Sequence, residues 1–124
     1  MVRNDRPPIA GVLVLATFFG TASCAREVAP DAVRRQGKLL FEAQGCVVCH
    51  GQEGHGDGPK SRSLNPRPRD FRERDAYLQG TRAGDIAATV KTGIVVHSAQ
   101  MPTFAHLTEA ERLALGEFVV SLQH

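Results

Sequence analysis

The chain has 124 residues and a formal net charge of +2, with 42% hydrophobic and 23% charged residues. These values fit a single soluble globular domain, and the near balance of charges excludes the strongly basic character of a nucleic-acid-binding protein. The chain contains no Trp and one Tyr. A domain so poor in aromatic residues has a small core, which a large buried cofactor would complete.

The first 23 residues have the composition of a secretory signal peptide. Arg3 and Arg6 precede an apolar run from Ile9 to Phe19, and small residues follow it. The run of about 11 residues is shorter than the roughly 20 that a membrane-spanning helix needs. We therefore expect a signal peptide over residues 1–23, a linker over 24–30 and one domain over 31–124.

Cys24 follows the small residues Ala22 and Ser23. This ending resembles a bacterial lipoprotein signal, in which the Cys becomes the lipidated N-terminus, although Thr21 stands where an aliphatic residue is usual. Lipidation would explain a thiol that otherwise has no partner. We therefore expect a lipid-anchored protein on the periplasmic side of a bacterial cell envelope. The alternative is cleavage after Ala25, which would release a soluble periplasmic protein without Cys24.

Three segments of the domain are predicted to be helical: residues 31–44, 84–92 and 108–122. Asp31 can cap the first helix and Gly45 can end it. Thr108 and Glu111 form a capping box at the start of the last helix. A weaker helical turn is expected at residues 74–78.

Two long segments are predicted to be loops. Residues 51–70 are rich in Gly and Pro, which excludes a long helix or a central strand, and a loop of that length in a small domain is expected to wrap something. Residues 94–107 have no helical pattern, and no stretch alternates as a strand does. The predicted fold class is therefore all-α with long loops.

The segment Cys46-Val47-Val48-Cys49-His50 has the Cys-x-x-Cys-His pattern of c-type haem attachment. Each thiol can form a thioether with one haem vinyl group, and His50 would bind the iron as an axial ligand. A Cys-x-x-Cys disulfide would leave His50 without a role. A zinc site needs about four ligands, and the other histidines are scattered: His55, His97, His106 and His124. The pattern predicts one covalent haem c.

Around this motif, residues 31–122 resemble the class I cytochrome c family of bacterial monohaem proteins. In that family a helix before the haem motif crosses the C-terminal helix at a close contact. Gly37 and Phe41 match the family's pattern on the first helix, and Leu115 and Phe118 match the contact pair on the last. The resemblance implies a small cytochrome c fold in which these two helices cross and long loops wrap the covalent haem.

Met101 is the only Met after the initiator, and Pro102 follows it. Pro102 disfavours a helical conformation at Met101, and the resemblance implies that Met101 is the second axial ligand of the iron. Met and His ligation raises the reduction potential. His97 is the rival ligand, and ligation by two His side chains would lower the potential.

A Pro-containing loop after the haem motif accepts a hydrogen bond from the axial His in the family. The residues around Pro66 match that loop, so the resemblance points to the carbonyl of Asn65 or Pro66. A metal-bound His usually donates its second ring N–H to such an acceptor.

These features predict electron transfer by the haem and no enzyme activity. Redox partner proteins would serve as donor and acceptor. Basic residues gather in residues 60–74 and acidic residues lie on the last helix, a layout that could orient docking. The alternative is a five-coordinate haem protein. It would be either a weak peroxidase, with His97 or His106 as the acid or base beside the open iron site, or a ligand sensor, which needs only the open site.

Overall fold

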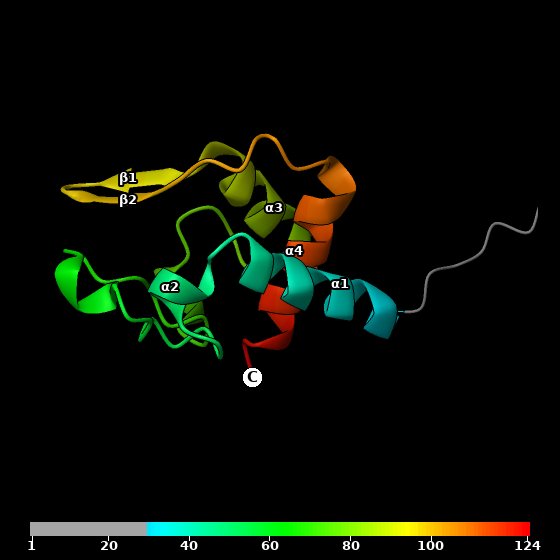
Figure 1. Cartoon of the computed structure of the whole chain (residues 1–124), viewed down its shortest axis with the longest axis horizontal. Helices are drawn as coiled ribbons and strands as arrows, with labels where there is room; N and C mark the ends of the chain where they lie inside the picture. Colours follow the sequence, from blue (N-terminus) through cyan, green and yellow to red (C-terminus); the bar gives the residue numbers. More distant parts are fainter. Residues whose placement is uncertain (1–29) are drawn as a thin grey trace, which may run out of the picture.

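The computed structural model describes residues 30–124, and these residues contain four α-helices, two 3-10 turns and one two-stranded sheet (Figure 1). The predicted signal peptide, Cys24 and the linker up to residue 29 lie outside the described residues. None of the helices within residues 30–124 combines the length and apolar character that crossing a membrane requires. The elements in chain order are α1 (Pro30–Ala43), α2 (Val47–His50), a 3-10 turn (Ser61–Ser63), a second 3-10 turn (Arg74–Ala76), α3 (Ala83–Thr92), β1 (Ile94–Val96), β2 (Ala99–Met101) and α4 (Glu109–Ser121).

Helix α1 confirms the first predicted helix with a shift of one residue. It begins at Pro30, which the sequence placed in the linker. Pro is favourable there because its fixed φ suits the first helical turn and its missing N–H has no helical partner at that position. After the helix ends, Gly45 adopts a φ of 76°, which a residue without a side chain reaches at little cost. The chain then turns directly into α2.

Helices α1 and α4 cross at Gly37 (Figure 1). A Cβ atom at Gly37 would lie 2.0 Å from the carbonyl oxygen of Ala114 and 2.8 Å from the Cβ of Phe118. Phe41, one turn later, packs its ring against Phe118 with 5.4 Å between centroids. The close crossing confirms the expected arrangement of the two helices. The backbone atoms of α4 that lie nearest to Gly37 belong to Ala114, one residue before the predicted contact residue Leu115. Leu115 itself is 2% exposed and lies in the core.

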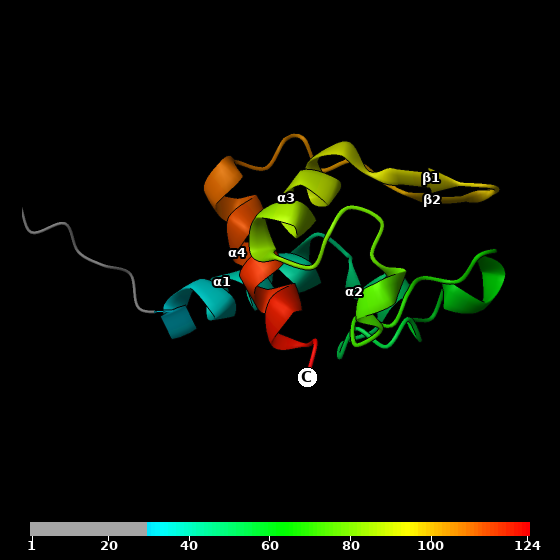
Figure 2. The same cartoon turned by 180° about the vertical axis from the view of Figure 1, so that it is seen from behind.

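Helix α3 packs on another side of α4 (Figure 2). The contact is close because Gly116 has no side chain: a Cβ there would lie 2.3 Å from the carbonyl oxygen of Ala83. Ile86 and Val90 of α3 join Val119 in the same buried core. Helix α4 therefore contacts both of the other long helices. It meets α1 at Gly37 of α1, and it meets α3 at its own Gly116.

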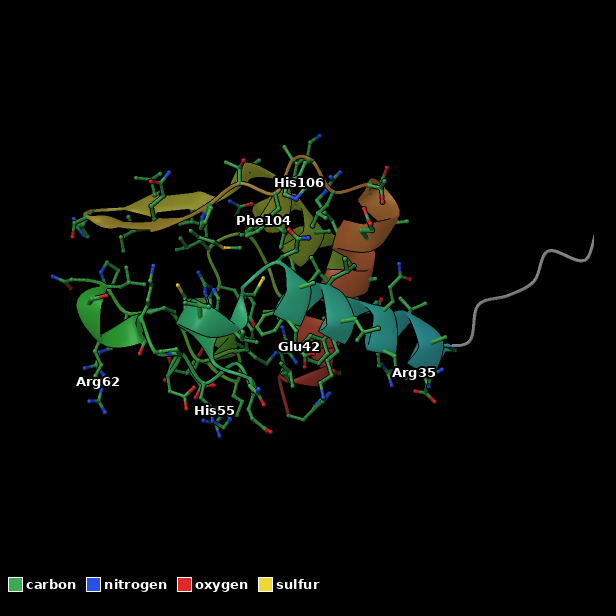
Figure 3. The ribbon with its side chains drawn as sticks, in the orientation of Figure 1. Arg35, Glu42, His55, Arg62, Phe104 and His106 are labelled. Carbon is green, nitrogen blue, oxygen red and sulfur yellow. The ribbon has the colours of Figure 1, made fainter. Side chains whose placement is uncertain are left out.

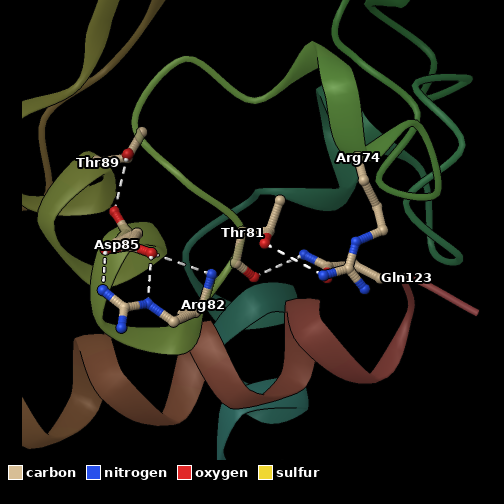
Figure 4. A network of polar contacts seen from close by, with 6 residues as sticks. All are labelled: Arg74, Thr81, Arg82, Asp85, Thr89 and Gln123. Carbon is tan, nitrogen blue, oxygen red and sulfur yellow. Dashed lines mark hydrogen bonds and ion pairs between the residues drawn. The ribbon is translucent and has the colours of Figure 1, made fainter.

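The start of α4 has the predicted capping box. The backbone N–H of Glu111 donates to the hydroxyl of Thr108 at 3.3 Å, and the Thr108 N–H donates to the Glu111 carboxylate at 2.7 Å. At the other end, the side-chain amide of Gln123 donates to the Thr81 carbonyl at 3.0 Å (Figure 4). Arg74 donates to the Thr81 hydroxyl at 3.3 Å (Figure 4). The first bond ties the C-terminal segment to the segment that leads into α3, and the second ties that segment to the 3-10 turn at Arg74–Ala76.

Residues 94–107, predicted to be a loop, contain a short hairpin. Strands β1 and β2 pair antiparallel with Ile94 opposite Met101, and the hairpin extends away from the helices (Figure 1). Strands of three residues are too short to show the alternation on which sequence-based prediction of strands depends. The two-residue turn contains His97 at a φ of 52°, where Gly, Asn or Asp is the usual signal. The class remains all-α apart from this hairpin.

Candidate functional site

A cavity of about 460 Å³ lies within the roughly 300–1,000 Å³ typical of cofactor pockets. Four parts of the chain line it: residues 44–50 after α1, the loop at residues 64–69, residues 73–78, and residues 94–104 with the hairpin. A smaller hollow of about 70 Å³ shares several of its lining residues and reaches toward Phe41 and Leu115 in the core. The four predicted site residues all line the larger cavity: Cys46, Cys49, His50 and Met101.

The one-turn helix α2 positions the haem motif. The backbone N–H of Cys46 donates to the Phe41 carbonyl at 3.0 Å, so the motif begins as a continuation of α1. The N–H of His50 donates to the Cys46 carbonyl at 2.9 Å, which closes a helical turn. In a helical turn, residues three and four apart share one face. Cys46, Cys49 and His50 have this spacing, and all three line the cavity.

The two thiols in the cavity are free and do not form a disulfide. Burial raises the pKa of Cys46 to about 11, and the nearby Cys49 adds to the rise. Reactive thiols have a depressed pKa, so Cys46 lacks the electrostatics of the nucleophile in a redox-active disulfide centre. Within residues 30–124 there is also no group of three or more His, Cys, Asp or Glu side chains that could hold a metal ion. The disulfide and zinc alternatives therefore find no support.

The ring of His50 is held among aromatic side chains. Phe71 stacks on it with 4.8 Å between centroids and 28° between planes, and Phe41 lies at 6.5 Å. Burial lowers the pKa of His50 to about 4, and the positive charge of Arg69 lowers it further, whereas the backbone of Arg69 opposes the shift. The imidazole is therefore neutral at physiological pH, and neutral imidazole is the form that binds metals.

The expected hydrogen-bond acceptor for His50 is not where the resemblance placed it. The carbonyl of Asn65 accepts a hydrogen bond from the Ser98 hydroxyl at 3.1 Å. The backbone near His50 Nδ1 belongs to Arg69, but no acceptor meets Nδ1 with hydrogen-bond geometry, and this buried nitrogen has no partner. The prediction was wrong because the loop reaches the ring through a residue several positions later than the Asn-Pro pair.

The structure separates Met101 from the other candidate ligands. Met101 lies in β2 and lines both the cavity and the smaller hollow, as His50 does. His97 is exposed in the hairpin turn, and His106 is exposed with its Nε2 3.1 Å from the Gln44 side-chain oxygen. Neither is among the residues that line the two hollows. His55, also exposed, lies on the opposite side of the molecule from His106 (Figure 3).

Two further residues at the site carried no clear signal in the sequence. Phe71 is an isolated aromatic in a loop, and its contact with His50 depends on how that loop folds back. Arg69 belongs to the basic segment that was expected to be solvated, yet it lines the cavity. Its guanidinium lies 4.8 Å from the centre of the Tyr77 ring and donates to the Ala76 carbonyl.

The site fits a haem by its own chemistry. It combines a predominantly apolar cavity, two unpaired thiols spaced one helical turn apart, and a neutral imidazole and a thioether on its lining. Thiols can bind the haem vinyl groups, and imidazole and thioether are established axial ligands.

Comparison with known proteins identifies the family. The family model "Cytochrome c" matches residues 35–123. One chain of a reducing HAO-like protein complex from Kuenenia stuttgartiensis is similar in structure, with a TM-score of 0.63 and 28% sequence identity. The match covers 78% of the present chain and 47% of that chain, so the present chain spans about half its length. The comparison with curated proteins found no match. Because the family model matches most of the chain, the protein belongs to the cytochrome c family, whose members bind c-type haem and transfer electrons.

Proposed function

We propose that this chain is a single-haem electron carrier with His and Met axial ligation, as in class I cytochromes c. The haem is attached through Cys46 and Cys49, and its iron is bound by His50 and Met101. One observation carries the proposal: a single cavity of suitable size is lined by all four side chains. They come from two parts of the chain about 50 residues apart, which only the tertiary structure brings to one cavity.

The haem supplies an iron that gains and loses one electron, and the protein residues set the conditions for that change. His50 is neutral because it is buried, so it is ready to bind without losing a proton. The thioether of Met101 is a soft ligand that favours ferrous iron and raises the reduction potential. Phe104 and Ile94 border the cavity and help to keep water away, which disfavours the more highly charged ferric state.

The alternatives, a haem enzyme and a ligand sensor, both need an open iron site, and the enzyme also needs an acid or base beside the vacant coordination position. The two histidines that could serve, His97 and His106, are exposed and do not line the cavity. This placement supports the electron carrier over the peroxidase. Met101 on the cavity lining, whose thioether could fill the open position, supports the carrier over the sensor.

Cytochrome c domains act with redox partner proteins. For this chain we propose a periplasmic location with anchoring through lipidated Cys24. The similar chain belongs to a larger protein complex, so association with a larger oxidoreductase is the second arrangement to test.

The optical spectrum of the ferric protein tests the axial ligands. Thioether ligation gives a weak far-red band, which we expect in the wild-type protein and in His97→Ala but not in Met101→Ala. A wild-type spectrum without the band, which His97→Ala alters and Met101→Ala leaves unchanged, would instead identify a bis-His carrier. If neither substitution changes the spectrum, the iron is five-coordinate and the carrier proposal fails.

Acid–acetone treatment tests the covalent attachment. We expect the haem to stay with the wild-type protein, because thioether bonds survive denaturation. Cys46→Ala and Cys49→Ala should each prevent formation of stable holoprotein. Release of the haem from the wild-type protein would contradict attachment at these two residues.

A further inference from the structure

Phe71 covers one face of the His50 imidazole. The two rings are nearly parallel, at 28°, with 4.8 Å between their centroids. Phe71 is 7% exposed and belongs to the buried core. It also meets Phe41 edge-on at 6.1 Å, so its ring is fixed by a second aromatic neighbour.

The backbone of Arg69 is the nearest candidate for the usual hydrogen-bond restraint on the His50 ring. A ligating imidazole ordinarily donates its second N–H to an acceptor that fixes the plane of the ring. Here His50 Nδ1 is buried and no acceptor meets it with hydrogen-bond geometry. The stacked ring of Phe71, at 4.8 Å against 6.5 Å for Phe41, is the closer aromatic contact and adds a restraint on rotation of the imidazole.

The Gly-rich loop after the haem motif holds Phe71 in place. The Phe71 N–H donates to the Gly54 carbonyl at 2.8 Å, and a Cβ at Gly54 would lie 2.2 Å from Cδ2 of the Phe71 ring. The absence of a side chain at Gly54 thus creates the space that the ring fills. In the same loop, the Gly56 N–H donates to the His50 carbonyl at 2.9 Å, which ties the loop to the ligand residue itself.

We propose that Phe71 is a positioning residue that sets the plane of the His50 imidazole over the haem. This inference rests on the proposed function, because it requires His50 to be an axial ligand. The plane of an axial imidazole determines how its π orbitals overlap with the iron orbitals. Removing the stacked ring therefore changes the electronic structure of the ferric iron, even where the protein stays folded and the haem stays attached.

The test compares ring-removing and ring-keeping variants of the full holoprotein. Phe71→Leu removes the ring and keeps apolar volume, and Phe71→Tyr keeps the ring. Phe118→Leu is the matched control, because Phe118 is also 7% exposed and packs on Phe41 without stacking on His50. If Phe71→Leu yields no holoprotein, Phe71→Met removes the ring with a flexible side chain that fills irregular space.

The readouts are the proton NMR shifts of the haem methyl groups and the EPR spectrum of the ferric protein, which report the orientation of the axial imidazole. We expect Phe71→Leu to change the order or spread of the methyl shifts and to broaden the low-spin EPR lines. Phe71→Tyr and Phe118→Leu should keep the wild-type pattern.

An unchanged pattern in Phe71→Leu, or an equal change in Phe118→Leu, would overturn the positioning role while leaving the carrier proposal intact. Failure of the carrier proposal looks different, because the wild-type protein would then lack the low-spin signature of an imidazole-bound iron. That second outcome would overturn both.

Discussion

Gly37→Ala tests whether the crossing of α1 and α4 depends on the absence of one side chain. The added Cβ would lie 2.0 Å from the Ala114 carbonyl oxygen, whereas ordinary contact begins at 3.4 Å. The obstructing atom is backbone, so no rotamer change relieves the overlap and the helices must separate. Overpacking costs about 1–3 kcal/mol, and a contact of 2.0 Å with a backbone atom belongs in the upper part of that range, about 2–3 kcal/mol. The better helix propensity of Ala returns about 1 kcal/mol. We expect a net loss of about 1–2 kcal/mol.

Thermal unfolding of the ferric holoprotein, followed by far-UV circular dichroism, measures this loss. For a domain of this size a loss of 1 kcal/mol lowers the Tm by about 4–8 °C, so Gly37→Ala should lower it by roughly 10 °C. Gly84→Ala in α3 is the matched control, because a Cβ there has no neighbour within 4 Å. That variant should gain about 0.5 kcal/mol through reduced freedom of the unfolded chain. A Tm for Gly37→Ala equal to that of the wild type, or an equal fall in Gly84→Ala, would refute the reasoning.

Three further predictions concern the cap of α4, the potential and the N-terminus. Thr108→Ala should cost about 1 kcal/mol in urea unfolding. The pKa of Glu111 is held below its usual 4.5, chiefly because the Thr108 backbone N–H donates to the carboxylate. The contribution of Glu111 to the free energy of unfolding is therefore present above pH 4.5 and is lost as the pH falls through the lower, folded-state pKa. A stabilising contribution of Glu111 that grew on acidification would contradict this sign. Met101→His should keep a low-spin iron but lower the midpoint potential in a redox titration, since imidazole stabilises ferric iron better than thioether does; a fall of about 100 mV would equal about 2.3 kcal/mol, and an unchanged potential would count against Met101 as ligand. Cys24→Ser should prevent lipid modification, and mass spectrometry that finds a wild-type N-terminus at Arg26 would show ordinary cleavage instead.

The local parts of this protein could be predicted from the sequence because short-range interactions determine them. The spacing of Cys46, Cys49 and His50 needs only one helical turn to bring three groups to one face. The capping box of α4 joins residues three positions apart, so the start of that helix could be assigned within one residue. The close crossing at Gly37 was expected through resemblance to a family, which supplies tertiary information that the pattern of residues alone does not contain.

Contacts between distant segments were decided by the tertiary structure. Gly116 has the same role as Gly37, yet nothing near it in the sequence indicates that Ala83 packs there. The hairpin was missed because three-residue strands depend on pairing with each other and not on a local pattern. Phe71 reaches His50 only because the Gly54 loop folds under it. The sequence therefore identified which groups could bind a haem, while the packing of loops that are remote along the chain determined which groups surround them.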